Sequence, residues 1–240
     1  MKTISIINQK GGVGKSVLAF NIGSVLQKKY NKKVLFIDLD PQTSLTDFIL
    51  PDLRENLTAY DLITKPNIKI GNTITTTDTG YSIIPSDIRL GAINKLKVSA
   101  LKNYLKNYND YDYCIIDCSP YLNELAKNAI MAADSIISVI KPDLVSSRGL
   151  ALLESTIKML DPKKSISAVV VNQYRKRKIS DLTIEVMKSN YPILNSIIKD
   201  RAVIAESASL AKDIIEYDGY KEAFKDFDNV IQELQSLEVL

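Results

Sequence analysis

The sequence of 240 residues predicts an α/β fold, in which helices flank a doubly wound, mostly parallel sheet. Two observations carry this prediction. Several short apolar runs are continuous rather than alternating, which is typical of strands that are covered on both faces. Amphipathic stretches of helical length lie between these runs, and such strand–helix alternation favours right-handed crossover connections.

The apolar runs predict strands at 4–7, 34–37, 113–116, 136–140 and 168–171. Helical patterns cover 18–26, 144–160 and 179–190, whereas the polar, turn-rich segment 64–80 is predicted to be a surface excursion. No linker or repeat divides the chain. We therefore expect a single domain over residues 1–240, with no separate DNA-reading domain ahead of the first strand.

The net charge of +3 hides an asymmetry along the chain. Residues 213–240 carry eight acidic and two basic side chains, whereas residues 1–212 carry 29 basic and 20 acidic ones. A basic body suggests a polyanionic partner. The acidic tail has apolar residues at helical spacing over 220–237. Because anionic lipid would repel its acidic face, we expect this helix to pack on the domain and not on a membrane.

The composition also excludes several classes of protein. The chain has no histidine, which removes the commonest general base and most zinc chemistry. No apolar run approaches the roughly 18 residues that cross a bilayer. Cys114 and Cys118 are too few for a disulfide framework, so a reducing cytosol is the simplest compartment and packing the simplest role for both thiols.

A glycine-rich loop follows the first predicted strand, in the stretch INQKGGVGKSVLAFNIG at residues 7–23. Such a loop directs backbone N–H groups at one point, and the following helix adds its positive end. Lys15 is expected to meet the β- and γ-phosphates, and the Ser16 hydroxyl to ligate Mg²⁺. The predicted nucleotide-binding set is Lys10, Gly11, Gly12, Val13, Gly14, Lys15, Ser16 and Val17. Gln9 stands where the common pattern has glycine, and Lys10 is an additional cation.

Three carboxylates end predicted strands. Asp38 and Asp40 follow the run at 34–37, and Asp117 follows the run at 113–116. Ligands bind at the carboxyl edge of open α/β sheets, so a magnesium-nucleotide site there is the economical account. Phosphoryl transfer mostly requires cations and an oriented water. We expect Asp40 to orient that water, and Lys10 and Lys15 to act beside it as catalytic cations.

These motifs resemble those of a known family. KGGVGKS is similar to the deviant Walker A motif of the ParA/MinD ATPases, DLDPQ to their A′ motif and IIDCSP to their Walker B motif. The likeness continues through AADSIISVIKPDLVSSRGL at 132–150 and VVVNQY at 169–174. The tail follows the partition branch in outline, without its usual Glu-Ala-Pro and Gly-Lys-Pro turns. DPQ and the absence of a basic C-terminal membrane helix favour the ParA branch over MinD.

The resemblance implies a P-loop NTPase fold of the deviant Walker A type, with ATP and Mg²⁺ as cofactors. Two subunits would close over two ATP molecules, and Lys10 would serve the partner's phosphates. Asn172 would read adenine, and Asp38 and Asp117 would organise Mg²⁺, partly through water. A ParB-like centromere-binding partner would stimulate slow hydrolysis, and the protein would be cytoplasmic and nucleoid-associated.

DNA contact is predicted for two basic clusters. The first cluster is Arg175, Lys176, Arg177 and Lys178, and the second is Lys199 and Arg201. Such clusters suit phosphate contacts that ignore base sequence.

Three alternatives stay open. A MinD-like membrane switch would bind lipid through the last helix. A small-molecule ligase or kinase of the dethiobiotin-synthetase type shares the deviant loop. An iron–sulfur carrier would use the cysteines as ligands.

Overall fold

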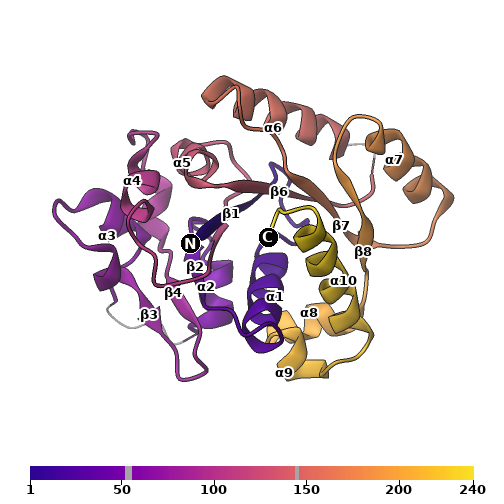
Figure 1. Ribbon diagram of the computed structural model, residues 1–240, viewed down its shortest axis with the longest axis horizontal. Helices are drawn as coiled ribbons and strands as arrows, with labels where there is room; N and C mark the ends of the chain where they lie inside the picture. Colours follow the sequence, from indigo (N-terminus) through magenta and orange to yellow (C-terminus); the bar gives the residue numbers. More distant parts are fainter. Residues whose placement is uncertain (52–55, 144–145) are drawn as a thin grey trace.

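A single sheet forms the frame of the molecule (Figure 1). The computed structural model describes residues 1–51, 56–143 and 146–240. These residues form an eight-stranded sheet in the order β3-β4-β2-β5-β1-β6-β7-β8, and every neighbouring pair is parallel except β3 with β4. The predicted doubly wound, mostly parallel sheet is confirmed. The chain leaves β1 toward β2 on one side and reaches β6 on the other, and ligands bind at such a reversal.

The strands are β1 (Lys2–Ile7), β2 (Val34–Asp38), β3 (Thr75–Thr76), β4 (Ser82–Ile84), β5 (Tyr113–Asp117), β6 (Ser135–Ile140), β7 (Ala168–Tyr174) and β8 (Ile193–Lys199). One face of the sheet is covered by α1 (Lys15–Lys28), α2 (Ser44–Ile49), α8 (Ala202–Ser209), α9 (Ile214–Asp218) and α10 (Glu222–Ser236). The other face carries α3 (Ala59–Thr64), α4 (Ala100–Leu105), α5 (Glu124–Ala132), α6 (Ser146–Leu160) and α7 (Lys178–Lys188). Two short 3₁₀ helices, η1 (Ile70–Thr73) and η2 (Ile88–Ala92), complete the described elements.

The predicted elements are confirmed, but the helices α2, α3, α4, α5 and α9 were not predicted, and neither were the strands toward the edges of the sheet. The five apolar runs form β1, β2, β5, β6 and β7, and every residue of β2 and β6 is buried. The excursion at 64–80 contains η1 and the edge strand β3. Sequence periodicity missed β4, which has three residues, and β8, whose burial is irregular because it is an edge strand. The start of the helix predicted at 144–160 lies outside the described residues at 144–145.

The acidic tail packs on the sheet through α10. Phe227, Ile231 and Leu234 are buried among α1 and the neighbouring strands. The carboxylate of Glu233 accepts hydrogen bonds from the backbone N–H groups of Asn195 (2.8 Å) and Ser196 (2.7 Å) on the edge strand β8. An edge strand with unpaired amides is a template for aggregation, so this carboxylate also protects the edge. Tyr220 and Leu237, predicted on the apolar stripe, flank the helix and are exposed.

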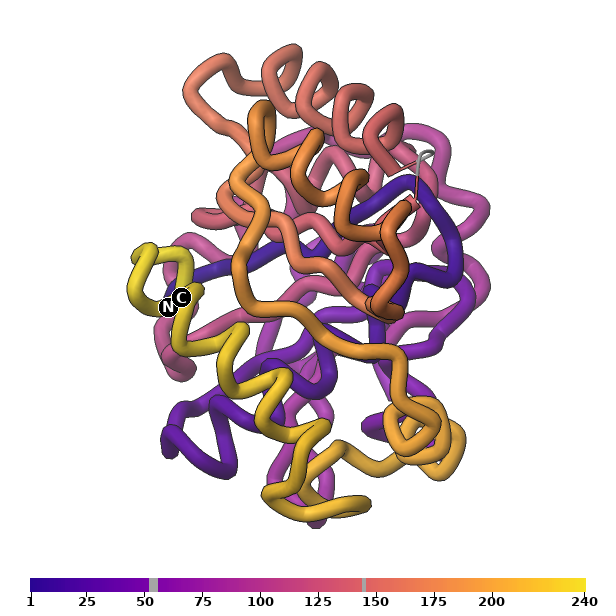
Figure 2. Tube along the Cα trace, turned by 90° about the vertical axis from the view of Figure 1, so that its right-hand side faces the viewer, coloured from indigo at the N-terminus to yellow at the C-terminus, as the bar shows by residue number. Residues whose placement is uncertain are grey.

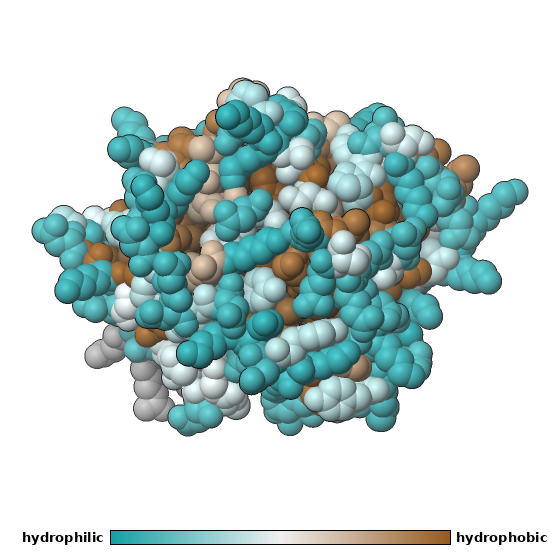
Figure 3. Space-filling view, in the orientation of Figure 1, coloured by the Kyte–Doolittle hydropathy of each residue, from teal (hydrophilic) through white to brown (hydrophobic). Residues whose placement is uncertain are grey.

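The two ends of the described chain lie side by side in both views (Figure 2). The Lys2 ammonium donates a hydrogen bond to the Glu238 carbonyl across this contact. Figure 3 shows that polar side chains predominate on one face of the molecule, with apolar ones between them in small areas. Most of the large apolar side chains are buried in the two hydrophobic cores, one on each face of the sheet.

Candidate nucleotide site

The phosphate loop (residues 9–16) joins β1 to α1 in a conformation that requires glycine. Gly12 and Gly14 have φ of +68° and +91°, which L-residues with a side chain rarely adopt. A Cβ at Gly14 would also lie 2.2 Å from Nδ2 of Asn172. That Nδ2 atom donates a hydrogen bond of 2.8 Å to the Val13 carbonyl. The loop is therefore fixed against the end of β7.

Six of the eight loop residues predicted to bind nucleotide line one cavity of about 350 Å³, whereas Lys10 and Val13 do not line it. Its lining residues are Gly11, Gly12, Gly14, Lys15, Ser16, Val17, Asp40, Gln42, Ser44, Phe48 and Pro120. The cavity lies at the carboxyl edge of the sheet, where α1 begins at Lys15. Only 6% of Lys15 is exposed, so this ammonium group is held inside the site. The loop, the lysine and the Asp40 carboxylate thus converge as the sequence predicts.

Asp117 is a buried carboxyl group without a partner. It ends β5 directly beside Asp38 in the register of β2 and β5. Both of its oxygens are buried, and neither has a hydrogen-bond partner among the residues that the structure describes. Burial and the neighbouring Asp38 charge raise the pKa of Asp117 well above its usual value, whereas the nearby Ser16 hydroxyl and Lys15 ammonium oppose the rise. An unpaired carboxyl beside a hydroxyl is the donor set that a hard divalent cation uses.

Asp38 differs from Asp117 because its oxygens are already used. Oδ1 accepts the backbone N–H of Asp40 (2.9 Å), and Oδ2 accepts both the N–H (2.9 Å) and the hydroxyl (2.8 Å) of Thr46. Burial, opposed by these hydrogen bonds, raises the pKa of Asp38 to about 6. Asp40 is 8% exposed, and its Oδ1 accepts the N–H of Gln42 (3.0 Å). The carboxylate of Asp40 lines the phosphate cavity, and that of Asp38 braces the backbone behind it.

Lys10 forms an ion pair within its own chain. Its ammonium group pairs with Asp143, which follows β6, and its backbone N–H donates to Asn8 Oδ1 (2.8 Å). Burial raises the pKa of Asp143, but the pairing with Lys10 and hydrogen bonds from Ser146 outweigh it and hold that pKa below its usual value. Both paired side chains are more than a third exposed. Service of Lys10 to a partner's phosphates stays a prediction, and it requires Lys10 to leave Asp143.

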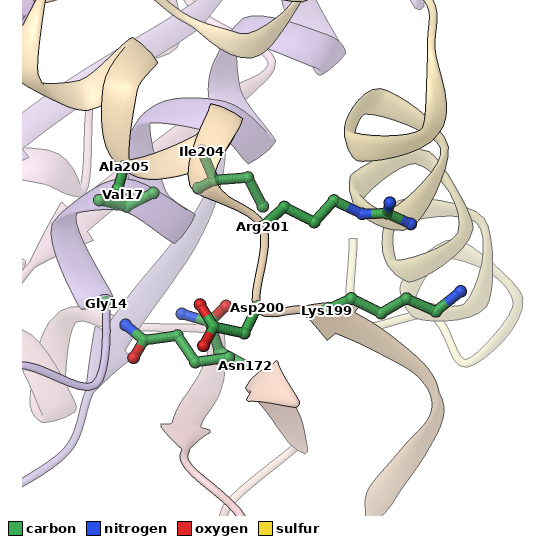
Figure 4. Close-up of a pocket in the computed structure, with 9 residues that line it drawn as sticks. Gly14, Val17, Asn172, Lys199, Asp200, Arg201, Ile204 and Ala205 are labelled. Atoms are coloured by element: carbon green, nitrogen blue, oxygen red, sulfur yellow. The ribbon is translucent and has the colours of Figure 1, made fainter. Parts of the chain in front are cut away.

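A second cavity, of about 220 Å³, adjoins the phosphate cavity through Gly14 and Val17, which line both. In Figure 4, Asn172 and Asp200 lie together on one side of it, whereas Val17, Ile204 and Ala205 lie on the other. A polar edge opposite an apolar wall suits a planar heterocyclic base. One N–H of the Asn172 amide donates to the Val13 carbonyl, so its Oδ1 and its second N–H are left for the base that it is predicted to read.

The structure brings the second predicted basic cluster and half of the first to one groove of about 700 Å³, which Arg177 and Lys178 do not line. Arg175 and Lys176 line it together with Lys199 and Arg201. Two of these cations are paired: Arg175 with Asp200, and Arg201 with Asp226 of α10 at 2.8 Å. In Figure 4, Lys199 and Arg201 extend away from the second cavity, toward α10. Within the described residues, Lys176, Arg177, Lys178 and Lys199 have no ion pair, and all four are exposed.

Sequence reasoning missed several residues at the site. Asp143 lies three residues after the buried strand β6, whereas Asp38 and Asp117 are the last residues of their strands, so the strand-end argument did not include it. Asp200 escaped because β8 carries no continuous apolar run. Gln42 lines the same cavity as Asp40 and lies two positions after it in the sequence, so it could have been included in the predicted site. Thr46 had no sequence signal, because its role depends on how α2 folds back on β2.

The cysteines occupy the core. Cys114 and Cys118 are fully buried, and burial raises the pKa of both thiols, that of Cys118 to about 12. Among the described residues, no cluster of three or more metal-ligating side chains occurs. No helix in the described part of the chain combines the length and the apolar character that a membrane span requires.

Comparison with known proteins gives one family. A family model described as an AAA domain matches residues 1–168. The chain is 28% identical over 235 residues to the chromosome partitioning protein ParA of Caulobacter vibrioides, which covers 91% of this chain and 88% of that protein. It is 30% identical over 250 residues to the chromosome-partitioning ATPase Soj of Treponema pallidum, with 97% and 96% covered.

Solved structures agree with this result. A plasmid partition protein of Borrelia burgdorferi, bound to AMPPNP, superposes with a TM-score of 0.87 at 26% identity and 98% coverage of both chains. Apo McdA of Cyanothece gives the same TM-score and identity, with 98% and 99% covered. The chain therefore belongs to the ParA-type partition ATPases, within the AAA-domain family that its first 168 residues match.

Proposed function

We propose that this protein is an ATP-dependent dimerising ATPase that helps to partition a plasmid or a chromosome. The observation that carries the proposal is the phosphate cavity, in which Lys15, Ser16 and Asp40 converge beside a pocket of the right shape for a base. The relatives named as partition proteins support the cellular role. The AMPPNP bound to the Borrelia burgdorferi plasmid partition protein supports a nucleoside triphosphate as the ligand.

In this proposal each polar group of the cavity has one task. Lys15 and the amides of residues 11–14 hold the triphosphate. Ser16 and Asp117 hold Mg²⁺, because Asp117 offers two buried oxygens that have no hydrogen-bond partner among the described residues, whereas both oxygens of Asp38 already accept hydrogen bonds. Mg²⁺, when bound with ATP, offsets phosphate charge. Asp40 orients the attacking water, and Asn172 contacts the adenine.

Dimerisation couples ATP to DNA in this scheme. Two subunits close over two ATP molecules, and each Lys10 leaves Asp143 to offset charge on the partner's phosphates. The basic groove and the first basic cluster then contact DNA phosphates without reading bases. The DNA-bound protein thus lies on the nucleoid until a ParB-like centromere-binding protein stimulates slow hydrolysis and releases it.

The test is DNA binding by fluorescence anisotropy with ATP, with ADP and without nucleotide, on two duplexes of unrelated sequence. The wild type is expected to bind both duplexes in the presence of ATP, weakly with ADP, and less as salt rises. Lys10→Ala is expected to lose the ATP-dependent part. Lys188→Ala is the matched control, because Lys188 is a similarly exposed lysine that is paired with Glu185 far along α7.

Three results would contradict the proposal. They are DNA binding that ignores the nucleotide, equal loss in the two lysine variants, and hydrolysis that requires a small metabolite and ignores DNA. The last result would favour a ligase or kinase. Binding of ATP-loaded protein to anionic liposomes would instead favour a membrane role.

A further inference from the structure

A closed ring of hydrogen bonds lies behind the Asp40 carboxylate. The Thr46 hydroxyl donates to Asp38 Oδ2 (2.8 Å) and accepts the backbone N–H of Ser86 (2.9 Å). The Ser86 hydroxyl donates to the Asp40 carbonyl (2.6 Å), and the Asp40 N–H donates to Asp38 Oδ1 (2.9 Å). Asp38, Thr46 and Ser86 are each 0% exposed. Four residues from β2, α2 and the loop after β4 thus form one buried network.

The ring holds the backbone of Asp40 on both sides. Its N–H is bound by Asp38 and its C=O by Ser86, so the peptide groups that carry this residue cannot rotate independently. The Thr46 hydroxyl closes the ring with its single hydrogen and one lone pair, which a valine of the same shape could not do. Such fully satisfied buried networks rigidify what they hold.

We propose that Thr46 and Ser86 are positioning residues for Asp40, and that Asp38 is the hub of this network and not a metal ligand. The inference rests on the proposed function, in which Asp40 orients the attacking water. Misplacement of a reacting group by about 1 Å costs on the order of 100-fold in rate. Removing one hydrogen bond of the ring is expected to lower the rate of ATP hydrolysis by on the order of tenfold. It is expected to leave the affinity for the triphosphate unchanged.

The test separates turnover from binding. Thr46→Val is expected to lower kcat for ATP about tenfold while the Kd of a fluorescent ATP analogue stays within about twofold. Thr46→Ser keeps the hydroxyl and is expected to restore kcat to near the wild-type value. Ser86→Ala breaks the ring at another link and is expected to lower kcat in the same way. Thr73→Val is the control, because Thr73 is equally buried and its hydroxyl donates to the Ile70 carbonyl, away from the site.

A second measurement addresses the metal. The Mg²⁺ concentration for half-maximal rate is expected to be unchanged in Asp38→Asn and raised in Asp117→Asn. A raised Mg²⁺ requirement in Asp38→Asn, or a wild-type kcat in both Thr46→Val and Ser86→Ala, would overturn the inference. If Thr46→Val fails to fold by circular dichroism, Ser86→Ala decides. A wild-type protein that hydrolyses no ATP would overturn the proposed function itself, whereas normal wild-type turnover with unaffected variants would overturn only this inference.

Discussion

At the scale of single residues, the unpaired, buried carboxyl of Asp117 destabilises the nucleotide-free protein. A buried polar group without a partner costs roughly 1 to 3 kcal/mol of folding free energy, and burial beside Asp38 raises its pKa. Folded protein therefore binds the Asp117 proton more tightly than unfolded protein does. The unfavourable contribution is absent in acid and grows as pH rises above the ordinary aspartate range.

Asp117→Asn is accordingly expected to stabilise the nucleotide-free protein. The gain should be about 1 to 3 kcal/mol at about pH 8 and smaller at about pH 5, because the amide removes only the cost of the charged form. Urea unfolding at the two pH values measures it. The same variant should bind Mg²⁺ and ATP less well. A loss of stability at the higher pH would contradict this account of the group.

The Lys10–Asp143 ion pair predicts that a substitution of Asp143 changes ATP-dependent dimerisation. Asp143→Asn removes the charge that holds Lys10 in its own chain, so Lys10 becomes available to a partner subunit at lower cost. A half-exposed pair is worth at most about 1 kcal/mol, which corresponds to roughly a fivefold lower concentration of ATP analogue for half-maximal dimerisation. Analytical ultracentrifugation measures this midpoint. Asp218→Asn, which breaks the Lys221 pair away from both cavities, controls for charge loss, and an unchanged or higher midpoint in Asp143→Asn would refute the idea.

At the scale of elements, the sequence predicts a strand or loop best where a local pattern, such as a continuous apolar run or a fixed motif spacing, determines it. β2 and β6 are buried throughout, so their apolar runs are continuous and easy to recognise. β8 has one side exposed to α10 and solvent, and its pattern gives no such signal. The phosphate loop was predictable because glycine, lysine and serine must occur at fixed spacing. Asp143 and Thr46 were not predicted, because their partners lie 133 and 8 residues away and only the fold brings them together.

The packing of α10 gives a prediction for an element. Phe227 is 1% exposed in the core on the α1 side of the sheet, so Phe227→Ala should lower the free energy of unfolding by about 3 to 5 kcal/mol. Leu237, at the end of the same helix, is 54% exposed, and Leu237→Ala should change it by less than about 0.5 kcal/mol. Denaturant unfolding of both variants checks the difference, and similar losses would show that α10 is docked differently.

At the scale of the whole molecule, the folded chain sorts its basic groups into two sets. Arg175 and Arg201 are neutralised by carboxylates of their own chain, whereas Lys176 and Lys178 have no ion pair in the described structure. The charge asymmetry between body and tail is therefore partly cancelled, because Asp226 of α10 lies on Arg201. Sequence counting cannot reveal this cancellation, since the two residues are separated by 25 positions.

The unpaired lysines should dominate the salt dependence of DNA binding. In Lys176→Ala/Lys178→Ala, the slope of log K against log salt should fall by about 1.8, the value for two lost phosphate contacts. Lys102→Ala/Lys106→Ala removes the same charge from α4 and the residue that follows it, on another part of the surface, and should leave the slope unchanged. Anisotropy titrations at several salt concentrations measure both slopes. Equal slopes in the two variants would mean that DNA does not use the first basic cluster.

The contact between Gly14 and Asn172 limits how the nucleotide preference of this site could be redesigned. The Asn172 amide, which lines the proposed base pocket, also supports the loop through the carbonyl of Val13. A library that randomises Asn172 to accept another base would therefore loosen the triphosphate grip at the same time. Selectivity and affinity are tied at this one side chain, so engineered variants should trade one for the other unless a new anchor for Val13 is introduced elsewhere.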